Sequence, residues 1–419
     1  MTISVAGSPV PETGLDPLDP DFQRDPYPFY DWLLRHDPVH RGQEGTWYVT
    51  RFPDVRTVMS DERFGCASVR DFWAEMVGPG ALQDVMSDTM FFEDNPHHAR
   101  LRKLIMPVFS PKRMRAMEPK IAHIVDELLE PLARRGHMDV VSEFGAPLAL
   151  HFVCNLIGVP PEGYDGVRRW SLDIAPTLDL VPSREEIIRG NQAMGEFTEY
   201  LTWLIGQRRA DRRDDMISVM LDEMDKDQSG YDRPLTTSMI VSTVISVVFA
   251  GHDTVTNQVS NTMLALIDHP DQHELLRRRP ELIESAVEES LRYDSSVQSN
   301  SRRVDEDTVI GGVQLRKGDF VVALMGAANR DPDVYPDPGR FDVTRAGAHP
   351  MSFGAGMRFC LGAVLARLEL RAALTRLVPL ADLRLDCARS DLSYQRSSMF
   401  RSLVDLPVRF TPATHYPPA

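Results

Sequence analysis

The stretch Phe353-Gly354-Ala355-Gly356-Met357-Arg358-Phe359-Cys360-Leu361-Gly362 is the most informative part of this 419-residue chain. Three glycines surround its one cysteine, and glycine lets a backbone approach a bulky ligand closely. A helical pattern follows at 363–378, and the N–H groups and positive end of that helix should face the sulfur. Such surroundings favour the thiolate form of Cys360, which is the form that binds metal. The alternative is a structural cysteine buried in a glycine-rich turn.

The decapeptide resembles the haem-binding signature of the cytochrome P-450 family, Phe-x-x-Gly-x-(Arg or His)-x-Cys-x-Gly. The resemblance implies that Cys360 is the axial ligand of iron in haem b. It also implies that Phe353, Gly354, Gly356 and Gly362 shape the loop around the cofactor. A thiolate ligand on haem iron favours cleavage of the O–O bond.

Composition limits the kind of protein and its partners. The chain has 42% hydrophobic and 26% charged residues, as soluble globular proteins do. A net charge of −15 argues against a nucleic-acid binder. The first thirty residues lack the pattern of a signal peptide, and no apolar run approaches the ~20 residues of a membrane span. The four cysteines have neither CxxC nor zinc spacing. We therefore expect a cytoplasmic protein that binds neither nucleic acid nor membrane.

Helical periodicity dominates the chain. Apolar residues recur at helical spacing over 114–134, 183–208, 236–268, 281–293 and 363–378. Short strands are predicted at 47–50, 308–310 and 320–324. The fold class is therefore mainly α with small β-sheets, in a single domain over 1–419 with a flexible N-terminus at about 1–20. The resemblance implies the cytochrome P-450 fold, a triangular helical domain with a long central helix and a smaller β-rich part.

The longest predicted helix, 236–268, is capped by Thr236 or Thr237 and stops before Pro270. Near its centre stands Ala250-Gly251-His252-Asp253-Thr254. Glycine and threonine in mid-helix can open the hydrogen-bond ladder, so we expect a local opening at this point.

The same pentapeptide resembles the oxygen-activation motif of the family. The resemblance implies that Ala250 and Gly251 face the haem and that Thr254 and Asp253 deliver protons during oxygen activation. We interpret His252 as a bystander on another face of the helix. The alternative is an ordinary helix that happens to carry these residues.

Glu289-Ser290-Leu291-Arg292 resembles the Glu-x-x-Arg motif of the family. Residues three apart share one face of a helix, so Glu289 and Arg292 can pair. The resemblance implies a structural role for this pair, with a third polar partner from the later loop 329–341.

Four basic residues are candidates for binding the two haem propionates. The segment 94–102 resembles a family segment in which a histidine and an arginine share a helical face. Buried carboxylates need charged hydrogen-bond donors. By resemblance these donors are His98, Arg102, Arg302 and Arg358.

By resemblance, five segments form the substrate pocket: the loop 67–92, the helices around 165–195, the central helix, the strand after Arg292 and the turn at 397–400. The first segment is rich in large apolar side chains, namely Phe72, Trp73, Met76, Val77, Met86, Met90, Phe91 and Phe92. Such side chains fill adaptable apolar cavities, although each could equally belong to a core. We expect a medium or large, mostly apolar substrate such as a polyketide, macrolide or terpenoid.

The resemblance implies a monooxygenase that hydroxylates or epoxidises a small molecule, in a pathway such as antibiotic biosynthesis. The chain has no flavin or nicotinamide motif, so a ferredoxin and its NAD(P)H-dependent reductase should supply the electrons. Candidate docking residues are Arg100, Lys103 and Arg113, and we expect a monomer. The alternatives are oxidative coupling, peroxide-driven oxidation or a non-catalytic haem sensor. The intact Asp253-Thr254 pair disfavours peroxide use and the sensor.

Overall fold

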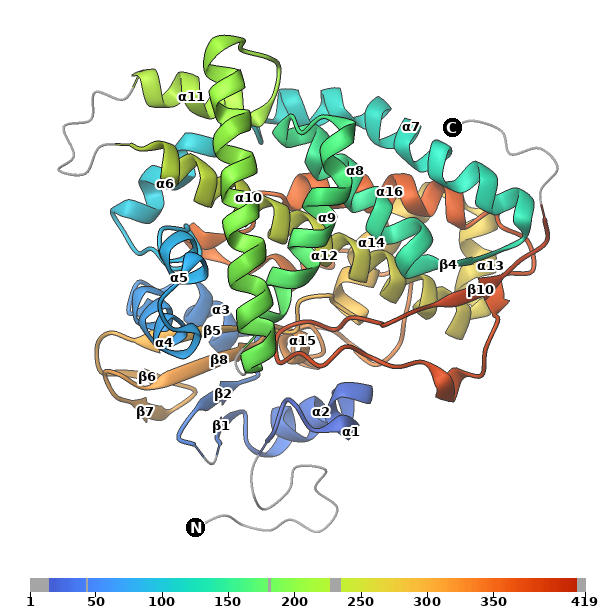
Figure 1. Ribbon diagram of the computed structural model, residues 1–419. Coiled ribbons are helices and arrows are strands. Elements are labelled where there is room, and N and C mark those ends of the chain that lie inside the picture. The colour runs from blue at the N-terminus through green and yellow to red at the C-terminus, as the bar shows by residue number, and fades with distance from the viewer. Residues whose placement is uncertain (1–14, 43, 180–181, 227–234, 413–419) are drawn as a thin grey trace. The chain divides into compact units, whose positions relative to one another are not determined.

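The structure is a computed structural model described over residues 15–42, 44–179, 182–226 and 235–412 (Figure 1). The chain divides into two compact units. Unit 1 comprises residues 1–65, 125–147 and 254–419, and unit 2 comprises residues 66–124 and 148–253. Three helices contribute residues to both units: α7 (Pro111–Arg135), α8 (Ala146–Ile157) and α12 (Thr237–Asp268).

A five-stranded sheet organises unit 1. Its strand order is β1-β2-β8-β5-β3, with β2 and β8 parallel and the other pairs antiparallel. The strands are β1 (Val39–Arg41), β2 (Trp47–Val49), β3 (Phe64–Gly65), β5 (Ser299–Val304) and β8 (Phe320–Leu324). Side chains alternate along β8, so Val321 and Ala323 join one core cluster while Val322 and Leu324 join another. Both faces of the sheet are therefore buried.

Two smaller sheets and seven α-helices complete the described part of unit 1. A hairpin pairs β6 (Thr308–Ile310) with β7 (Val313–Leu315), and a second sheet has the order β4-β10-β9. Its strands are β4 (His137–Asp139), β9 (Arg384–Leu385) and β10 (Pro407–Arg409). The helices are α1 (Pro20–Arg24), α2 (Tyr27–His36), α3 (Phe52–Ser60), α13 (Pro270–Arg278), α14 (Ile283–Tyr293), α15 (Met325–Ala328) and α16 (Ala363–Leu377).

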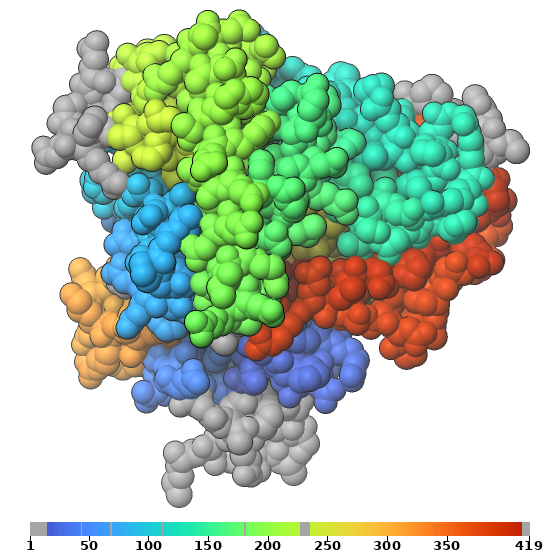
Figure 2. Space-filling model, viewed as in Figure 1, coloured from blue at the N-terminus to red at the C-terminus, as the bar shows by residue number. Residues whose placement is uncertain are grey.

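All the regular secondary structure in the described residues of unit 2 is helical. Besides the shared helices it contains α4 (Ala67–Val77), α5 (Ala81–Met86), α6 (His97–Ile105), α9 (Tyr164–Ile174), α10 (Arg184–Ala210) and α11 (Met216–Lys226). The longest of these, α10, starts at a capping box formed by Ser183 and Glu186. Its buried residues recur at helical spacing, as at Gly190, Ala193 and Phe197, and its other face is exposed (Figure 2).

The structure confirms the five helices and three strands expected from periodicity, each within a few residues of its predicted ends. The prediction of a loop over 67–92 is wrong, because α4 and α5 occupy most of it. Asp94 caps α4 by accepting hydrogen bonds from the N–H groups of Cys66 and Ala67, a contact that sequence spacing does not predict. Residues 1–14 of the expected flexible N-terminus lie outside the described residues, while Leu15 is buried.

The central helix α12 runs without interruption from Thr237 to Asp268, so the local opening expected near its middle is not present. A Cβ at Gly251 would lie 3.4 Å from a methyl of Val153, which is an ordinary van der Waals distance, so Val153 of α8 packs directly against the helix at this glycine. Two stretches, Val140–Ile157 and Thr237–Asp268, are apolar and long enough to span a membrane, but 61% and 72% of their most apolar windows are buried. Core helices of soluble proteins have the same property.

Candidate functional site

The loop before Cys360 is built from tight turns. Two 3-10 turns, η5 (Met351–Phe353) and η6 (Gly356–Arg358), precede the cysteine, and α16 begins just after Gly362. Gly354 and Gly356 have φ of 71° and 66°, in the left-handed region that favours glycine. A Cβ at Gly356 would lie 2.6 Å from the Cβ of Ser60 on α3. Glycine is therefore required at this position.

Cys360 differs from the other cysteines in its exposure. None of the four forms a disulfide; Cys66 and Cys154 are buried, Cys387 is half-buried and Cys360 is exposed. Burial raises the pKa of Cys154 to about 12, which makes that thiol a poor ligand. Beside Cys360 the side chains of Met357 and Phe359 are 39% and 41% exposed. An exposed thiol flanked by exposed apolar side chains is suited to an apolar ligand with a metal at its centre.

An arginine on α16 lies behind the loop. The guanidinium of Arg367 stands 4.4 Å from the ring centre of Phe353. Its Nε and Nη2 donate hydrogen bonds to the carboxylate of Glu288 on α14, the latter at 2.9 Å. The ring of Phe353 is thus packed against the positively charged guanidinium of Arg367. The carboxylate of Glu288 holds that guanidinium in position. Sequence analysis missed this contact, since no spacing rule relates Glu288 to Arg367.

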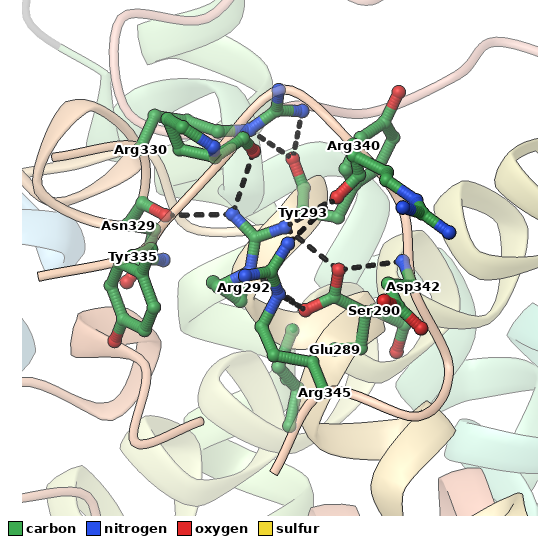
Figure 3. Close-up of polar contacts among 12 residues, drawn as sticks. Glu289, Ser290, Arg292, Tyr293, Asn329, Arg330, Tyr335, Arg340, Asp342 and Arg345 are labelled. Carbon is green, nitrogen blue, oxygen red and sulfur yellow. Dashed lines mark hydrogen bonds and ion pairs between the residues drawn. The ribbon is translucent and has the colours of Figure 1, made fainter. Parts of the chain in front are cut away.

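Glu289 and Arg292 form a fully buried ion pair, as their spacing predicts (Figure 3). Arg292 Nε and Nη2 donate to the two carboxylate oxygens of Glu289 at 2.7 and 2.8 Å. The remaining N–H groups donate to backbone carbonyls of Asn329, Pro338 and Arg340 at 2.9–3.1 Å. These carbonyls lie in the loop expected to supply the third partner.

The third polar side chain, however, comes from beyond that loop. Arg345 Nε donates to Glu289 Oε2 at 3.1 Å, and its Nη atoms donate to carbonyls of Pro336, Asp337 and Arg340 (Figure 3). The prediction that residues 329–341 contain the third partner is therefore incomplete. No sequence signal separates Arg345 from the many exposed arginines.

Asn329 connects the buried ion pair to the cysteine loop. Its carbonyl accepts the hydrogen bond from Arg292, and its side-chain oxygen accepts one from Met351 N at 2.7 Å. Its side-chain amide also donates to Ser352 Oγ, which in turn donates to Leu291 O at 2.7 Å. The ion pair and the first turn of the cysteine loop thus share one hydrogen-bond network.

The central helix α12 has one stripe that is not buried. From Met239 to Leu266 every residue is buried except Val247, Ala250, Gly251, Asp253 and Thr254. Four of these exceptions follow the i, i+3, i+4, i+7 spacing of one helical face, with Asp253 at its edge. Sequence reasoning had singled out all of them except Val247. An apolar helix with one partly exposed stripe has space beside it for a ligand.

His252 lies on the opposite side of the helix, as expected for a bystander. It is 3% exposed, and its Nδ1 lies 3.2 Å from Oδ1 of Asp253. The carboxylate of Asp253 is 31% exposed. Asp253 therefore has a buried imidazole on one side and solvent on the other.

The candidate propionate ligands lie in both units. In unit 2, α6 carries His98, which is buried, and Arg102, which is half-buried. In unit 1, Arg302 is 4% exposed on β5 and donates to Asn300 Oδ1 and Ser301 O, while Arg358 is half-buried in η6. The neighbouring Arg303 donates to Gly318 O at 3.0 Å.

The apolar side chains of 67–92 divide into two groups. Trp73, Val77 and Met86 are core residues, and the Trp73 indole donates to Thr177 O at 2.8 Å. Phe72 and Phe91 are 45% and 41% exposed. The second group has surface available for a ligand, and the first group does not.

These residues fit a haem with a single protein ligand to iron. Among the described residues no group of three or more His, Cys, Asp or Glu side chains could hold a metal ion by themselves. A porphyrin supplies the other ligands, so one exposed cysteine is sufficient. The exposed apolar side chains beside Cys360 suit the flat face of the ring. Fold and site therefore fit the class of haem-binding proteins.

Comparison with known proteins gives the same class. The family model for cytochrome P-450 matches residues 169–392. The crystal structure of CalO2 is 50% identical, with a TM-score of 0.91, over 96% of this chain and 99% of that one. The structure of P450BioI in complex with a hexadec-9Z-enoic acid-ligated acyl carrier protein is 35% identical, with a TM-score of 0.85, over 94% of this chain and 99% of that one.

The cytochrome P-450 monooxygenase PikC of Streptomyces venezuelae is 33% identical over 97% of this chain and 96% of its own length. The chain belongs to the cytochrome P-450 family. It is an oxidoreductase of the monooxygenase class, which uses O2, haem iron and electrons from a redox partner.

Proposed function

We propose that this enzyme hydroxylates or epoxidises a medium or large, mostly apolar small molecule, with haem b as its cofactor. The setting is bacterial specialised metabolism in the cytoplasm, such as the tailoring of a polyketide or macrolide. The observation that carries the proposal is the exposed Cys360 in a turn that glycine makes possible. The partly exposed stripe of α12 supports it independently.

The overall reaction sets what the chain must provide. Inserting one oxygen atom of O2 into a C–H bond consumes two electrons and two protons, and the second oxygen atom leaves as water. Haem iron held by a thiolate supplies the reduction and cleavage of O2. The protein must hold the thiolate, conduct the protons, orient the substrate and accept the electrons.

Cys360 provides the thiolate, and the chain around it controls the sulfur. The N–H of Cys360 donates to Phe353 O at 3.0 Å, which fixes the direction of the side chain. The first turn of α16 places N–H dipoles near the sulfur, and these favour its negative charge. The network of Arg292, Asn329 and Ser352 keeps the loop in this shape.

His98, Arg102, Arg302 and Arg358 bind and orient the haem by its propionates. Charged donors stabilise a carboxylate more strongly than neutral ones do. Arg302 is buried and its backbone lies in the central sheet of unit 1, so its position is well defined.

Thr254 and Asp253 conduct protons. The Thr254 hydroxyl holds a water molecule on the partly exposed stripe and passes protons from it. The Asp253 carboxylate, which is in contact with solvent, exchanges protons with bulk water. The buried His252 beside Asp253 limits the positions that this carboxylate can take.

Phe72 and Phe91 are the candidates for contact with an apolar substrate, because both are large apolar residues that are partly exposed. The resemblance to P450BioI, which was solved with a long acyl chain on a carrier protein, supports an apolar substrate.

A small ferredoxin with its NAD(P)H-dependent reductase supplies the electrons to a monomeric enzyme.

The carbon-monoxide difference spectrum of the reduced protein tests this proposal. The wild type should show the Soret peak that is diagnostic of thiolate-ligated haem. Cys360→Ser should lose that peak, and the matched variant Cys387→Ser should keep it. A wild type without the peak, or a Cys360→Ser protein that retains it, would refute the proposal.

A further inference from the structure

Helix α1 holds the turn Ser397–Phe400 by a side-chain amide. Gln23 Nε2 donates to Ser397 O at 2.7 Å, and its Oε1 accepts from Ser397 N at 3.2 Å. One amide thus satisfies both backbone polar groups of a single residue, as a neighbouring strand would. Nε2 of Gln23 also donates to Pro17 O, which fixes the side chain from the other direction.

Arg401 provides a second attachment to the same helix. It is 7% exposed, and its Nη atoms donate to Gln23 O at 3.1 Å and Arg24 O at 3.3 Å. Its Nε lies 2.8 Å from Oδ1 of Asp294, which also accepts a hydrogen bond from Tyr27 OH at 2.6 Å. Ser397 and Arg401, on either side of the tip of the turn, are therefore both bound to α1. Arg401 is also linked to Tyr27, the first residue of α2, through Asp294.

On its other side the turn pairs with the strand that follows Arg292. Gln298 N donates to Met399 O at 2.8 Å, and Ser299 Oγ donates to Ser398 O at 2.9 Å. Val297 and Phe400 form an antiparallel bridge. Met399 and Phe400 are half-buried, so part of each side chain remains open to a ligand.

We propose that Gln23 is a specificity-determining positioning residue for large substrates. It does not contact the substrate; it holds Ser397, and with it Met399 and Phe400, against the segment at 296–299 that leads into β5. The inference rests on the proposed function and on the family resemblance, which assigns the turn at 397–400 and the segment after Arg292 to the substrate pocket. A ligand large enough to reach the turn should bind more tightly when the turn is already ordered. Binding then does not reduce the conformational entropy of the turn. A small ligand of the iron does not reach the turn.

The test compares two inhibitors that bind haem iron through an azole nitrogen. Imidazole is the small probe and clotrimazole the large one, and each dissociation constant is read from the shift of the Soret band. The variant Gln23→Met keeps the length of the side chain and removes the two hydrogen bonds to Ser397 together with the one to Pro17. The matched control is Gln314→Met, because Gln314 Nε2 also donates to two backbone carbonyls, those of Thr308 and Leu315 at 3.0 and 2.9 Å. It lies in the β6–β7 hairpin, which supplies no proposed pocket segment.

Gln23→Met should weaken clotrimazole binding about fivefold or more and change imidazole binding less than twofold. Gln314→Met should change neither by more than twofold. An unchanged ratio of the two constants in Gln23→Met would overturn the inference, as would an equal loss of clotrimazole binding in the control.

Amide hydrogen exchange gives a readout that needs no haem chemistry. The peptide covering 397–400 should exchange at least tenfold faster in Gln23→Met than in the wild type and in Gln314→Met. Unchanged exchange would show that Gln23 does not hold the turn. If the wild type lacked the thiolate Soret peak while exchange accelerated as expected, the proposed function would fail and the attachment of the turn would stand.

Discussion

Thr254 lies in the one stripe of α12 that is not buried, and nothing in local helix geometry requires that stripe. Outside that stripe and Asp253, the residues of the helix from Met239 to Leu266 are buried, apolar and polar alike. Another threonine of α12, Thr262, is buried and donates to Gln258 O at 2.6 Å. Thr254 is therefore partly exposed in that stripe, whereas the hydroxyl of Thr262 is buried and hydrogen-bonded to the backbone.

Thr254→Ala should divert electrons from product to peroxide. Removing the hydroxyl removes a proton donor while leaving the haem site otherwise intact, so product per NAD(P)H oxidised should fall about tenfold. The measurement is product and peroxide yield with a substrate found by spin-state titration. Thr262→Ala should keep the wild-type yield. Equal coupling in Thr254→Ala and the wild type would contradict the proton-delivery role.

Glu369 on α16 is a buried carboxyl without an assigned role. It is 3% exposed, its Oε2 has no hydrogen-bond partner in the described part of the chain, and burial raises its pKa well above the ordinary value. The folded protein therefore keeps this proton at pH values at which the unfolded chain has released it. This carboxyl lowers stability progressively as the pH rises above the unfolded pKa.

Glu369→Gln should remove that dependence. The urea midpoint of the wild type should fall relative to that of the variant by roughly 0.3 M or more between pH 5 and pH 8. Glu284→Gln serves as the control, since the Glu284 side chain is 79% exposed, and its midpoint should follow the wild type. A midpoint difference between Glu369→Gln and the wild type that stays constant with pH would disprove the assignment.

Three acidic residues of helix α14 form ion pairs with arginines on α16, on α14 itself and in the loop that carries Arg345. Glu284 pairs with Arg371 at 3.3 Å, Glu288 with Arg367, and Glu289 with Arg292 and Arg345. The first contact is exposed and the last is fully buried. Because exposed pairs contribute little and broken buried pairs cost much, the stability of this arrangement depends mainly on Glu289.

Arg292→Met should destabilise the protein by about 3–5 kcal/mol, because Glu289 would lose its main partner while remaining buried. Backbone carbonyls of the loop at 329–340 would also lose their donor. Urea unfolding measures the free energy, and the height of the thiolate Soret peak measures haem retention. Arg371→Met removes a comparable but exposed arginine and should cost at most about 1 kcal/mol. Similar costs for the two variants would contradict this ranking.

At the scale of the whole molecule, a net charge of −15 works against an acidic redox partner. Attraction must then come from a local basic surface. Of the three candidate residues, Lys103 on α6 is exposed, Arg100 is half-buried, and Arg113 already donates to Asp214 at 2.8 Å. Lys103 is therefore the strongest candidate for docking.

Lys103→Glu should slow reduction by ferredoxin about tenfold at low salt, and the difference should shrink as ionic strength increases. Stopped-flow reduction in the presence of carbon monoxide measures the rate. Lys317→Glu, in the exposed turn between β7 and β8, changes the net charge equally and should have a smaller effect. Equal rates for the two variants would show that total charge, and not a local surface, controls docking.

The sequence alone determined the elements with strong periodicity and the residues that local spacing brings together. The helices at 236–268 and 363–378, the Glu289–Arg292 pair and the glycine turn before Cys360 are of this kind, because each depends on neighbours within a few positions. Other short strands, such as β1 and β3, and the helices α4 and α5 were missed, because their periodic patterns are too short to stand out from the surrounding sequence.

Only the tertiary structure decided which residues far apart in the chain share a site. Arg345 joins Glu289, Arg367 covers Phe353, Asn329 links the ion pair to the cysteine loop, and Gln23 holds Ser397 across 374 positions. It also decided that α12 stays unbroken and leaves one stripe uncovered. Contacts of this kind depend on packing between elements. The periodicity of the sequence does not reveal which distant residues pack together.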